Sequence, residues 1–189
     1  MNTRDVFDEL IITMKNILDY HCDHGALSWI GLEKVARAES HAASQLTFKE
    51  KSIAPFGRYL VHQEERFNIQ VDIFSEKYIG CPHTHDTWGA LGVISGRLKV
   101  VDYQLIDNSL TTLRSSLLLP GAASTFKADS DWHSTETFEL PQVVSFHIYG
   151  EAFDLANGKR FNKDVGVEKY VRGTLHDVDQ CIRFFTENN

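Results

Sequence analysis

The sequence predicts a mainly β protein, an antiparallel sandwich or barrel that follows an N-terminal helical cap. The 189 residues have an ordinary globular composition, with 42% hydrophobic and 24% charged residues. The first 20 residues carry apolar side chains at helical spacing. Beyond Pro55, short β-rich stretches alternate with turn residues, and little helical pattern separates them. Together these features favour a β-fold of many short strands.

The first 50 residues are expected to form the helical cap. Residues 5–20 repeat apolar positions at helical spacing and are expected to form an amphipathic helix. A second, weaker helix is expected after Ser28, a residue that suits an N-cap, and a third short helical piece over 40–47. The apolar positions of the first helix are Val6, Phe7, Leu10, Ile11, Met14, Ile17 and Leu18.

The central part of the chain predicts at least seven strands, and the pattern loosens after Gly150. Residues 174–186 again have helical periodicity. We expect one domain over residues 1–189, in which 1–50 is the cap, 56–154 the β-barrel core and 155–189 a C-terminal extension. The β-rich stretches are 57–62, 67–74, 90–95, 97–105, 110–118, 122–127 and 142–149, separated by turns that include Gly96, Asp107-Asn108 and Pro120-Gly121.

Charge and cysteine content exclude several classes of protein. The net charge of −7 disfavours binding to nucleic acid or to anionic lipid. No run of 18 apolar residues predicts a membrane span. The three cysteines (Cys22, Cys81 and Cys181) are odd in number and far apart, which is typical of free thiols in a reducing cytosol. We therefore expect a cytoplasmic protein, a monomer or small homo-oligomer, without nucleic-acid or membrane partners.

The segment between Gly80 and Gly96 contains the most informative motif. His83 and His85 are two residues apart, so on an extended strand both imidazoles project from one face and can converge on a metal ion. His133 follows at a spacing that resembles the two-motif metal site of the cupin superfamily. Asp86 should point to the opposite face, so no carboxylate completes the set.

A site of three imidazoles has a different charge from the common site of two histidines and one carboxylate. Replacing the carboxylate by a neutral imidazole leaves a bound ion one unit more positive, which favours an anionic ligand such as a thiolate. Three histidines can also hold Zn²⁺ and activate water. The spacing alone does not separate these two cases.

The core resembles the cysteine dioxygenase-type thiol dioxygenases of the cupin superfamily, over about residues 56–154. The resemblance implies a cupin double-stranded β-helix, a jelly-roll-like barrel that uses Fe(II) and O₂ to oxidise a small thiol to its sulfinic acid. The matching segments are Gly57-Arg58-Tyr59-Leu60-Val61, Arg66-Phe67-Asn68-Ile69, Pro82-His83-Thr84-His85 with Trp88-Gly89, and Val144-Ser145-Phe146-His147-Ile148-Tyr149.

The resemblance implies a role for each site residue. His83, His85 and His133 match the metal ligands, and Arg58 matches the arginine that binds the substrate carboxylate. The alternating residues of a catalytic triad, which fall on one strand face, are Ser145, His147 and Tyr149.

Two positions depart from the family pattern. Gly89 stands where mammalian-type members have a cysteine linked to the tyrosine, and Phe56 stands where a tyrosine precedes the family arginine. The retained Arg58 favours cysteine or a similar carboxylate-bearing thiol over 3-mercaptopropionate. Two alternatives are another metal-dependent cupin enzyme (a non-thiol dioxygenase, or a zinc-site hydrolase or isomerase) and a non-catalytic metal-binding cupin sensor.

Overall fold

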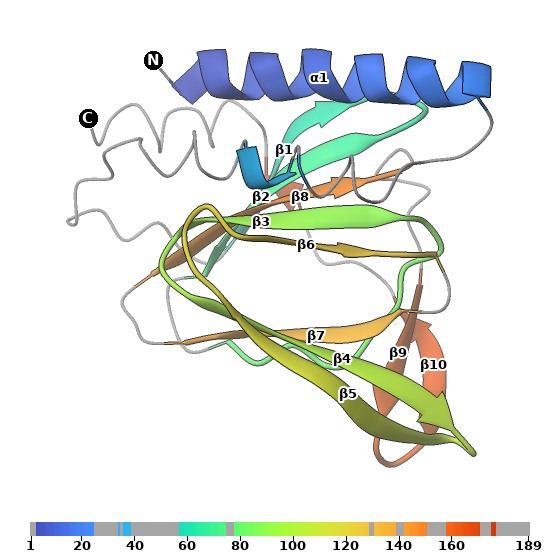
Figure 1. Cartoon of the computed structure of the whole chain (residues 1–189). Coiled ribbons are helices and arrows are strands. Elements are labelled where there is room, and N and C mark those ends of the chain that lie inside the picture. Colours follow the sequence, from blue (N-terminus) through green and yellow to red (C-terminus); the bar gives the residue numbers. More distant parts are fainter. Residues whose placement is uncertain are drawn as a thin grey trace.

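A computed structural model describes residues 3–24, 34, 36–38, 57–74, 78–128, 131–138, 142–150, 158–170 and 175–176 (Figure 1). Its elements are α1 (Thr3–His24), β1 (Gly57–Gln63), β2 (Asn68–Phe74), β3 (Gly89–Ser95), β4 (Leu98–Ile106), β5 (Ser109–Leu118), β6 (Ala123–Phe126), β7 (Trp132–Thr137), β8 (Val143–Tyr149), β9 (Gly158–Asn162), β10 (Gly166–Tyr170) and β11 (Leu175–His176). No helix in these ranges is long and apolar enough to cross a membrane.

The strands form two facing sheets with jelly-roll topology. Within the larger sheet, the strand order β2-β8-β3-β6 forms one half of the roll. The other half has the order β7-β4-β5, extended by the segment 78–85, which bridges to β7 at Ile79–Glu136 and His83–His133. These seven strands and the segment 78–85, four in each half, make the double-stranded β-helix of the cupin type. The predicted mainly β fold class is therefore confirmed.

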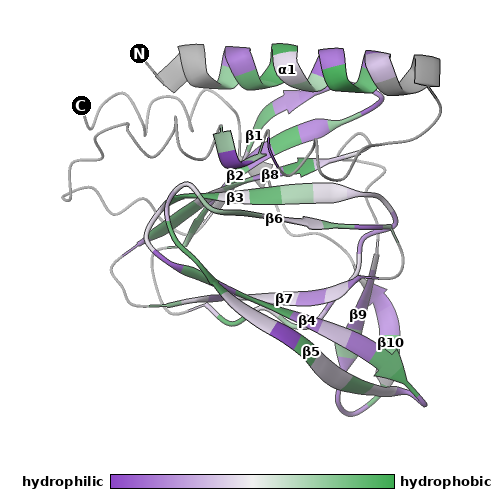
Figure 2. Cartoon of the chain, in the orientation of Figure 1, coloured by the Kyte–Doolittle hydropathy of each residue, from purple (hydrophilic) through white to green (hydrophobic). Residues whose placement is uncertain are grey.

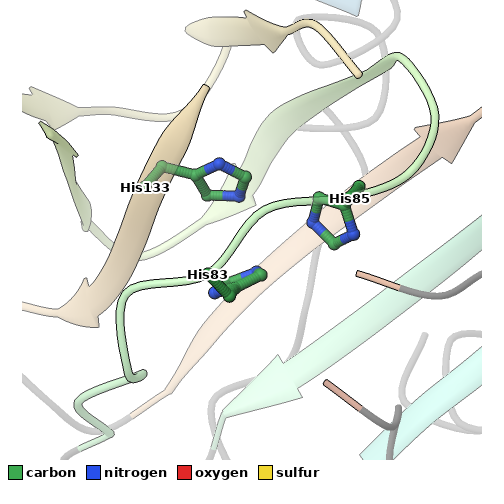
Figure 3. A group of neighbouring side chains, drawn as sticks. All are labelled: His83, His85 and His133. Atoms are coloured by element: carbon green, nitrogen blue, oxygen red, sulfur yellow. The ribbon is translucent and has the colours of Figure 1, made fainter. Parts of the chain in front are cut away.

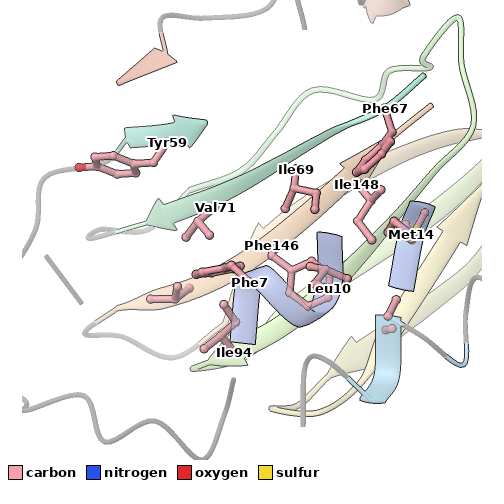
Figure 4. Packing of buried hydrophobic residues seen from close by; sticks show 14 of the residues in the cluster. Phe7, Leu10, Met14, Tyr59, Phe67, Ile69, Val71, Ile94, Phe146 and Ile148 are labelled. Atoms are coloured by element: carbon pink, nitrogen blue, oxygen red, sulfur yellow. The ribbon is translucent and has the colours of Figure 1, made fainter. Parts of the chain in front are cut away.

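Helix α1 covers the outer face of the larger sheet (Figure 1). Its buried side chains recur every three or four residues, at Phe7, Leu10, Met14 and Leu18, so they form a single apolar stripe. Figure 2 shows the apolar and polar bands that alternate along the helix. The stripe packs against side chains such as Ile148 of the sheet (Figure 4), which confirms the helix predicted over 5–20.

The sheet separates apolar and polar side chains because alternate residues point to opposite faces. On β2, Ile69, Val71 and Ile73 belong to the cluster under α1. The intervening Asn68, Gln70 and Asp72 are buried polar residues on the inner face. Strand β8 alternates in the same way, with Val144, Phe146 and Ile148 outward. The outer face therefore supplies the core, and the inner face is available for a polar site.

Between the two sheets, a second apolar cluster fills part of the barrel. It contains Phe74 and Leu91 from the larger sheet and Leu98 and Val100 from the smaller one. Asp107 and Asn108, with φ of 47° and 59°, form the predicted two-residue turn between β4 and β5.

Several expected elements differ from the structure. Residues 34 and 36–38 are helical, in agreement with the second helix, whereas 40–47 lie outside the described residues. The helix expected over 174–186 is wrong at its start, because Leu175 and His176 pair in parallel with β1 as strand β11; residues 177–189 are not described. Strands β7, β9 and β10 were not predicted. The single-domain division of the chain stays a prediction.

Candidate metal centre

The structure brings the three candidate ligands together at one end of the barrel. The backbone of His83 exchanges two hydrogen bonds with that of His133 on β7, with N–O distances of 2.8 and 2.9 Å. His85 follows two residues later, and potential ligand atoms of all three imidazoles lie within 4.8 Å of one another. Figure 3 shows the three rings converging on one space. Pairing of segment 78–85 with β7 therefore assembles a group that could hold a metal ion.

Hydrogen bonds define the tautomers of two of these rings. The Nδ1 of His83 donates to the carbonyl oxygen of Cys81 at 2.9 Å, and the Nδ1 of His133 donates to that of Asp131 at 3.1 Å. A carbonyl only accepts, so each Nδ1 carries the proton and each Nε2 presents a lone pair. Burial lowers the pKa of His133 below the ordinary value, which keeps this imidazole neutral and able to bind metal.

No carboxylate joins this group among the residues that the structure describes. Three neutral imidazoles suit iron, zinc, copper or nickel, and they leave the full charge of a divalent ion uncompensated by protein. The donor set therefore fits a transition metal and favours an anionic additional ligand.

Phe126 of β6 packs against two of the candidate ligands. Its ring centroid is 4.8 Å from that of His85 and 4.8 Å from that of His133. Gly89 makes room for this ring, because a Cβ at position 89 would lie 2.1 Å from the Phe126 Cζ. The space that a cysteine side chain would need at position 89 is thus filled by Phe126.

A small cavity of about 20 Å³ adjoins the three histidines. The apolar Phe74 and Leu91 line it together with polar side chains from five segments of the barrel. Arg58 of β1 is its one lysine or arginine, and Asp72 of β2 is its one acidic residue, among the lining residues of the described chain. The other lining residues are Tyr78, His83, His85, His133, Thr135, His147 and Tyr149.

The residues predicted as a triad form a continuous hydrogen-bonded row on the inner face of β8. His147 Nε2 lies 3.0 Å from Ser145 Oγ, and His147 Nδ1 lies 3.3 Å from the Tyr149 hydroxyl. The Tyr149 ring centroid is 4.8 Å from that of His85. Because a neutral imidazole donates from one nitrogen and accepts at the other, the row links the orientation of the tyrosine to that of the serine.

Asp72 was not predicted as a site residue. Its Oδ2 lies 3.4 Å from Arg58 Nε and 3.7 Å from His147 Nε2, and its side chain is 5% exposed. The signal in the sequence is the alternation Asn68-Ile-Gln70-Val-Asp72, which places three polar side chains on one face of an otherwise apolar strand. The same parity rule that indicated His83 and His85 would have identified this row.

The β9–β10 hairpin holds the histidine segment from the side opposite β7. Thr84 N donates to Lys159 O, and Phe161 N donates to Pro82 O, both at 2.8 Å. At Gly158 a Cβ would lie 2.1 Å from the Thr84 carbonyl oxygen, so a side chain there would force the two segments apart. The segment that carries His83 and His85 therefore lies between two strands.

No protein-family model and no curated protein matches the chain. Among solved structures, it is similar to an RmlC-like cupin with a double-stranded β-helix fold from Methanocaldococcus jannaschii (10% identity, 56% of this chain and 88% of that chain, TM-score 0.43). It is also similar to KdgF from Halomonas sp. (16%, 58% and 97%, 0.43) and to the DMSP lyase DddQ from Ruegeria pomeroyi (12%, 58% and 56%, 0.42). The strand order, rather than these likenesses, identifies the fold.

Proposed function

We propose that this protein is an iron(II)-dependent thiol dioxygenase that converts a small carboxylate-bearing thiol, such as cysteine, to its sulfinic acid. The observation that carries the proposal is the composition of one cavity. The three-histidine group without a carboxylate shares it with Arg58 and with the row that ends at Tyr149. The segments that resemble thiol dioxygenases contain Arg58, His83, His85 and the row from Ser145 to Tyr149, and His133 follows at the matching spacing.

The donor set of the chain fits iron(II). His83 and His133 present Nε2 lone pairs, and burial also lowers the pKa of His133 below its ordinary value. Iron(II), when bound by these histidines, would supply affinity for thiolate and O₂ and the redox chemistry that joins them. The overall reaction balances without another reductant, because thiol plus O₂ contains the same atoms as the sulfinic acid.

The remaining cavity residues would bind and orient the substrate. The guanidinium of Arg58 matches a carboxylate in charge and planar geometry. The Tyr149 hydroxyl, which is held by His147 and lies beside His85, would donate a hydrogen bond to the reacting end of the substrate. The apolar Phe74 and Leu91, which also line the cavity, would help to exclude water from the reacting groups.

The test is anaerobic loading with iron(II) or zinc(II), followed by O₂ uptake with cysteine, 3-mercaptopropionate and cysteamine. We expect one O₂ consumed for each sulfinate formed with iron, and none with zinc. His133→Ala should lose iron and activity. His62→Ala is the matched control, because His62 lies on β1 beside Glu64 and outside the histidine group. An iron-loaded protein that consumes no O₂ with any of the three thiols would disprove the proposal.

A further inference from the structure

The carboxylate of Asp72 occupies the centre of a row that crosses three strands. Arg58 of β1 is in register with Asp72 of β2, and Asp72 is in register with Ser145 of β8. Residues in register lie on the same face of a sheet, here the inner face that lines the cavity. A negative charge therefore stands next to the arginine that would bind the substrate carboxylate.

The two oxygens of this carboxylate have different surroundings. Oδ2 makes the ion pair with Arg58 Nε at 3.4 Å and lies 3.7 Å from His147 Nε2. Oδ1 is buried, and it accepts no hydrogen bond within the described structure. A buried charged acceptor without a donor is unfavourable and uncommon in folded proteins, so it calls for a partner.

Charge in the cavity indicates what that partner is. Besides its histidines, the described lining of the cavity has one basic residue, Arg58, and one acidic residue, Asp72. A ligand with only a carboxylate would gain the arginine but meet repulsion from the aspartate. A ligand that also carries an ammonium group would pair with both charges.

We propose that Asp72 is a specificity-determining residue that binds the ammonium group of the substrate through Oδ1 while Arg58 binds its carboxylate. The inference deepens the proposed function, on which its thiol chemistry rests. It assigns the site to thiols that bear both charged groups. A cavity built to accept a hydrogen bond from an amino group disfavours the analogue that lacks this donor.

The experiment compares Asp72→Asn with the wild-type protein, both loaded with iron(II). Asparagine keeps the size and one oxygen but loses the negative charge. Binding of cysteine, 3-mercaptopropionate and cysteamine is measured by calorimetry under argon, and turnover is then measured with O₂. Glu136→Gln is the matched control, because Glu136 of β7 pairs with Lys99 of β4 and does not line the cavity. Thermal unfolding establishes that the variants are folded, and Asp72→Ser provides a second loss of charge.

For the Asp72 variants we expect cysteine and cysteamine to bind about ten- to a hundredfold more weakly, the effect of losing a hydrogen bond to a charged group. Binding of 3-mercaptopropionate, which lacks the ammonium, should be unchanged or tighter. If Asp72 only positioned Arg58, cysteine and 3-mercaptopropionate would weaken equally, and that result would overturn the inference.

The two proposals fail in distinguishable ways. If no thiol is oxidised but the Asp72 variants still lose the preference for ammonium-bearing ligands, the dioxygenase function is wrong and the role of Asp72 stands. If thiols are oxidised with the same relative kcat/KM in the wild type and both variants, the function stands and the role of Asp72 is wrong.

Discussion

A single methyl group at position 89 should disturb the metal centre through Phe126. In Gly89→Ala, the added Cβ would lie 2.1 Å from Phe126 Cζ, 2.4 Å from Cε2 and 2.7 Å from the Ile148 carbonyl oxygen. Ordinary contact begins near 3.4 Å, so the ring must move by about 1.3 Å. The ring packs against His85 and His133, and its movement would disturb the positions of both imidazoles.

Overpacking of this kind costs about 1–3 kcal/mol. For a chain of this size, each kcal/mol lowers Tm by roughly 2–4 °C, so Gly89→Ala should lower Tm by about 2–12 °C. Calorimetry of the metal-free protein measures this shift, and a competition titration with a chelator measures the accompanying loss of iron affinity. Gly80→Ala is the control, because its Cβ would meet nothing closer than 3.1 Å.

The double variant Gly89→Ala/Phe126→Leu separates steric conflict from other effects. Leucine is smaller than phenylalanine, so the second substitution should recover part of the Tm lost in the first, as a coupled pair does. If Gly89→Ala changes neither Tm nor iron affinity relative to Gly80→Ala, the reasoning about Phe126 is refuted.

Four further outcomes are expected. His133→Ala should retain less than a tenth of the iron bound by the wild type, as measured by metal analysis after gel filtration; full retention would exclude it as a ligand. Arg58→Ala should raise KM for carboxylate-bearing thiols about ten- to a hundredfold and leave KM for cysteamine unchanged. An equal rise of KM for cysteamine would contradict the binding of the substrate carboxylate by Arg58. Burial lowers the pKa of His133 in the folded protein. Once the pH falls below the ordinary value of 6.5, the unfolded chain therefore binds more protons than the folded chain does. The unfolding free energy of the metal-free protein should therefore fall with pH from that point, with a shallower slope in His133→Gln. Leu10→Ala should lower the unfolding free energy by about 2–5 kcal/mol in urea melts, since Leu10 is buried between α1 and the sheet.

Local periodicity accounts for the elements that the sequence predicts well. Helix α1 has an apolar stripe of 3.6-residue period, and the strands of the larger sheet alternate or are bounded by turn residues. The β9–β10 hairpin is held by pairing and by backbone bonds to segment 78–85, more than 70 residues away in the case of Thr84 and Lys159. Such long-range partners leave no local pattern, and the same reason explains the strand at Leu175 in place of a helix.

In the candidate site, too, local patterns place some residues, whereas long-range strand pairing places others. Strand parity is enough to place His83 with His85, and Ser145 with His147 and Tyr149, on common faces. The proximity of Arg58 to Asp72 depends on the register between β1 and β2, which includes a shift between Leu60 and His62. The packing of Phe126 against the histidines depends on the pairing of β6 with β3. Neither register follows from the sequence of one strand, which is why the contact of Asp72 with Arg58 and that of Phe126 with the histidines were not predicted.

The position of segment 82–85 between β7 and β9 has a thermodynamic consequence. The entropy of ordering this segment is lost when the chain folds rather than when an ion binds. The folded apoprotein therefore presents its imidazoles in advance, and ion uptake needs no accompanying folding phase, in contrast to zinc fingers that fold only with their metal. The affinity for the ion then depends on how firmly β7 and β9 hold segment 82–85 in place.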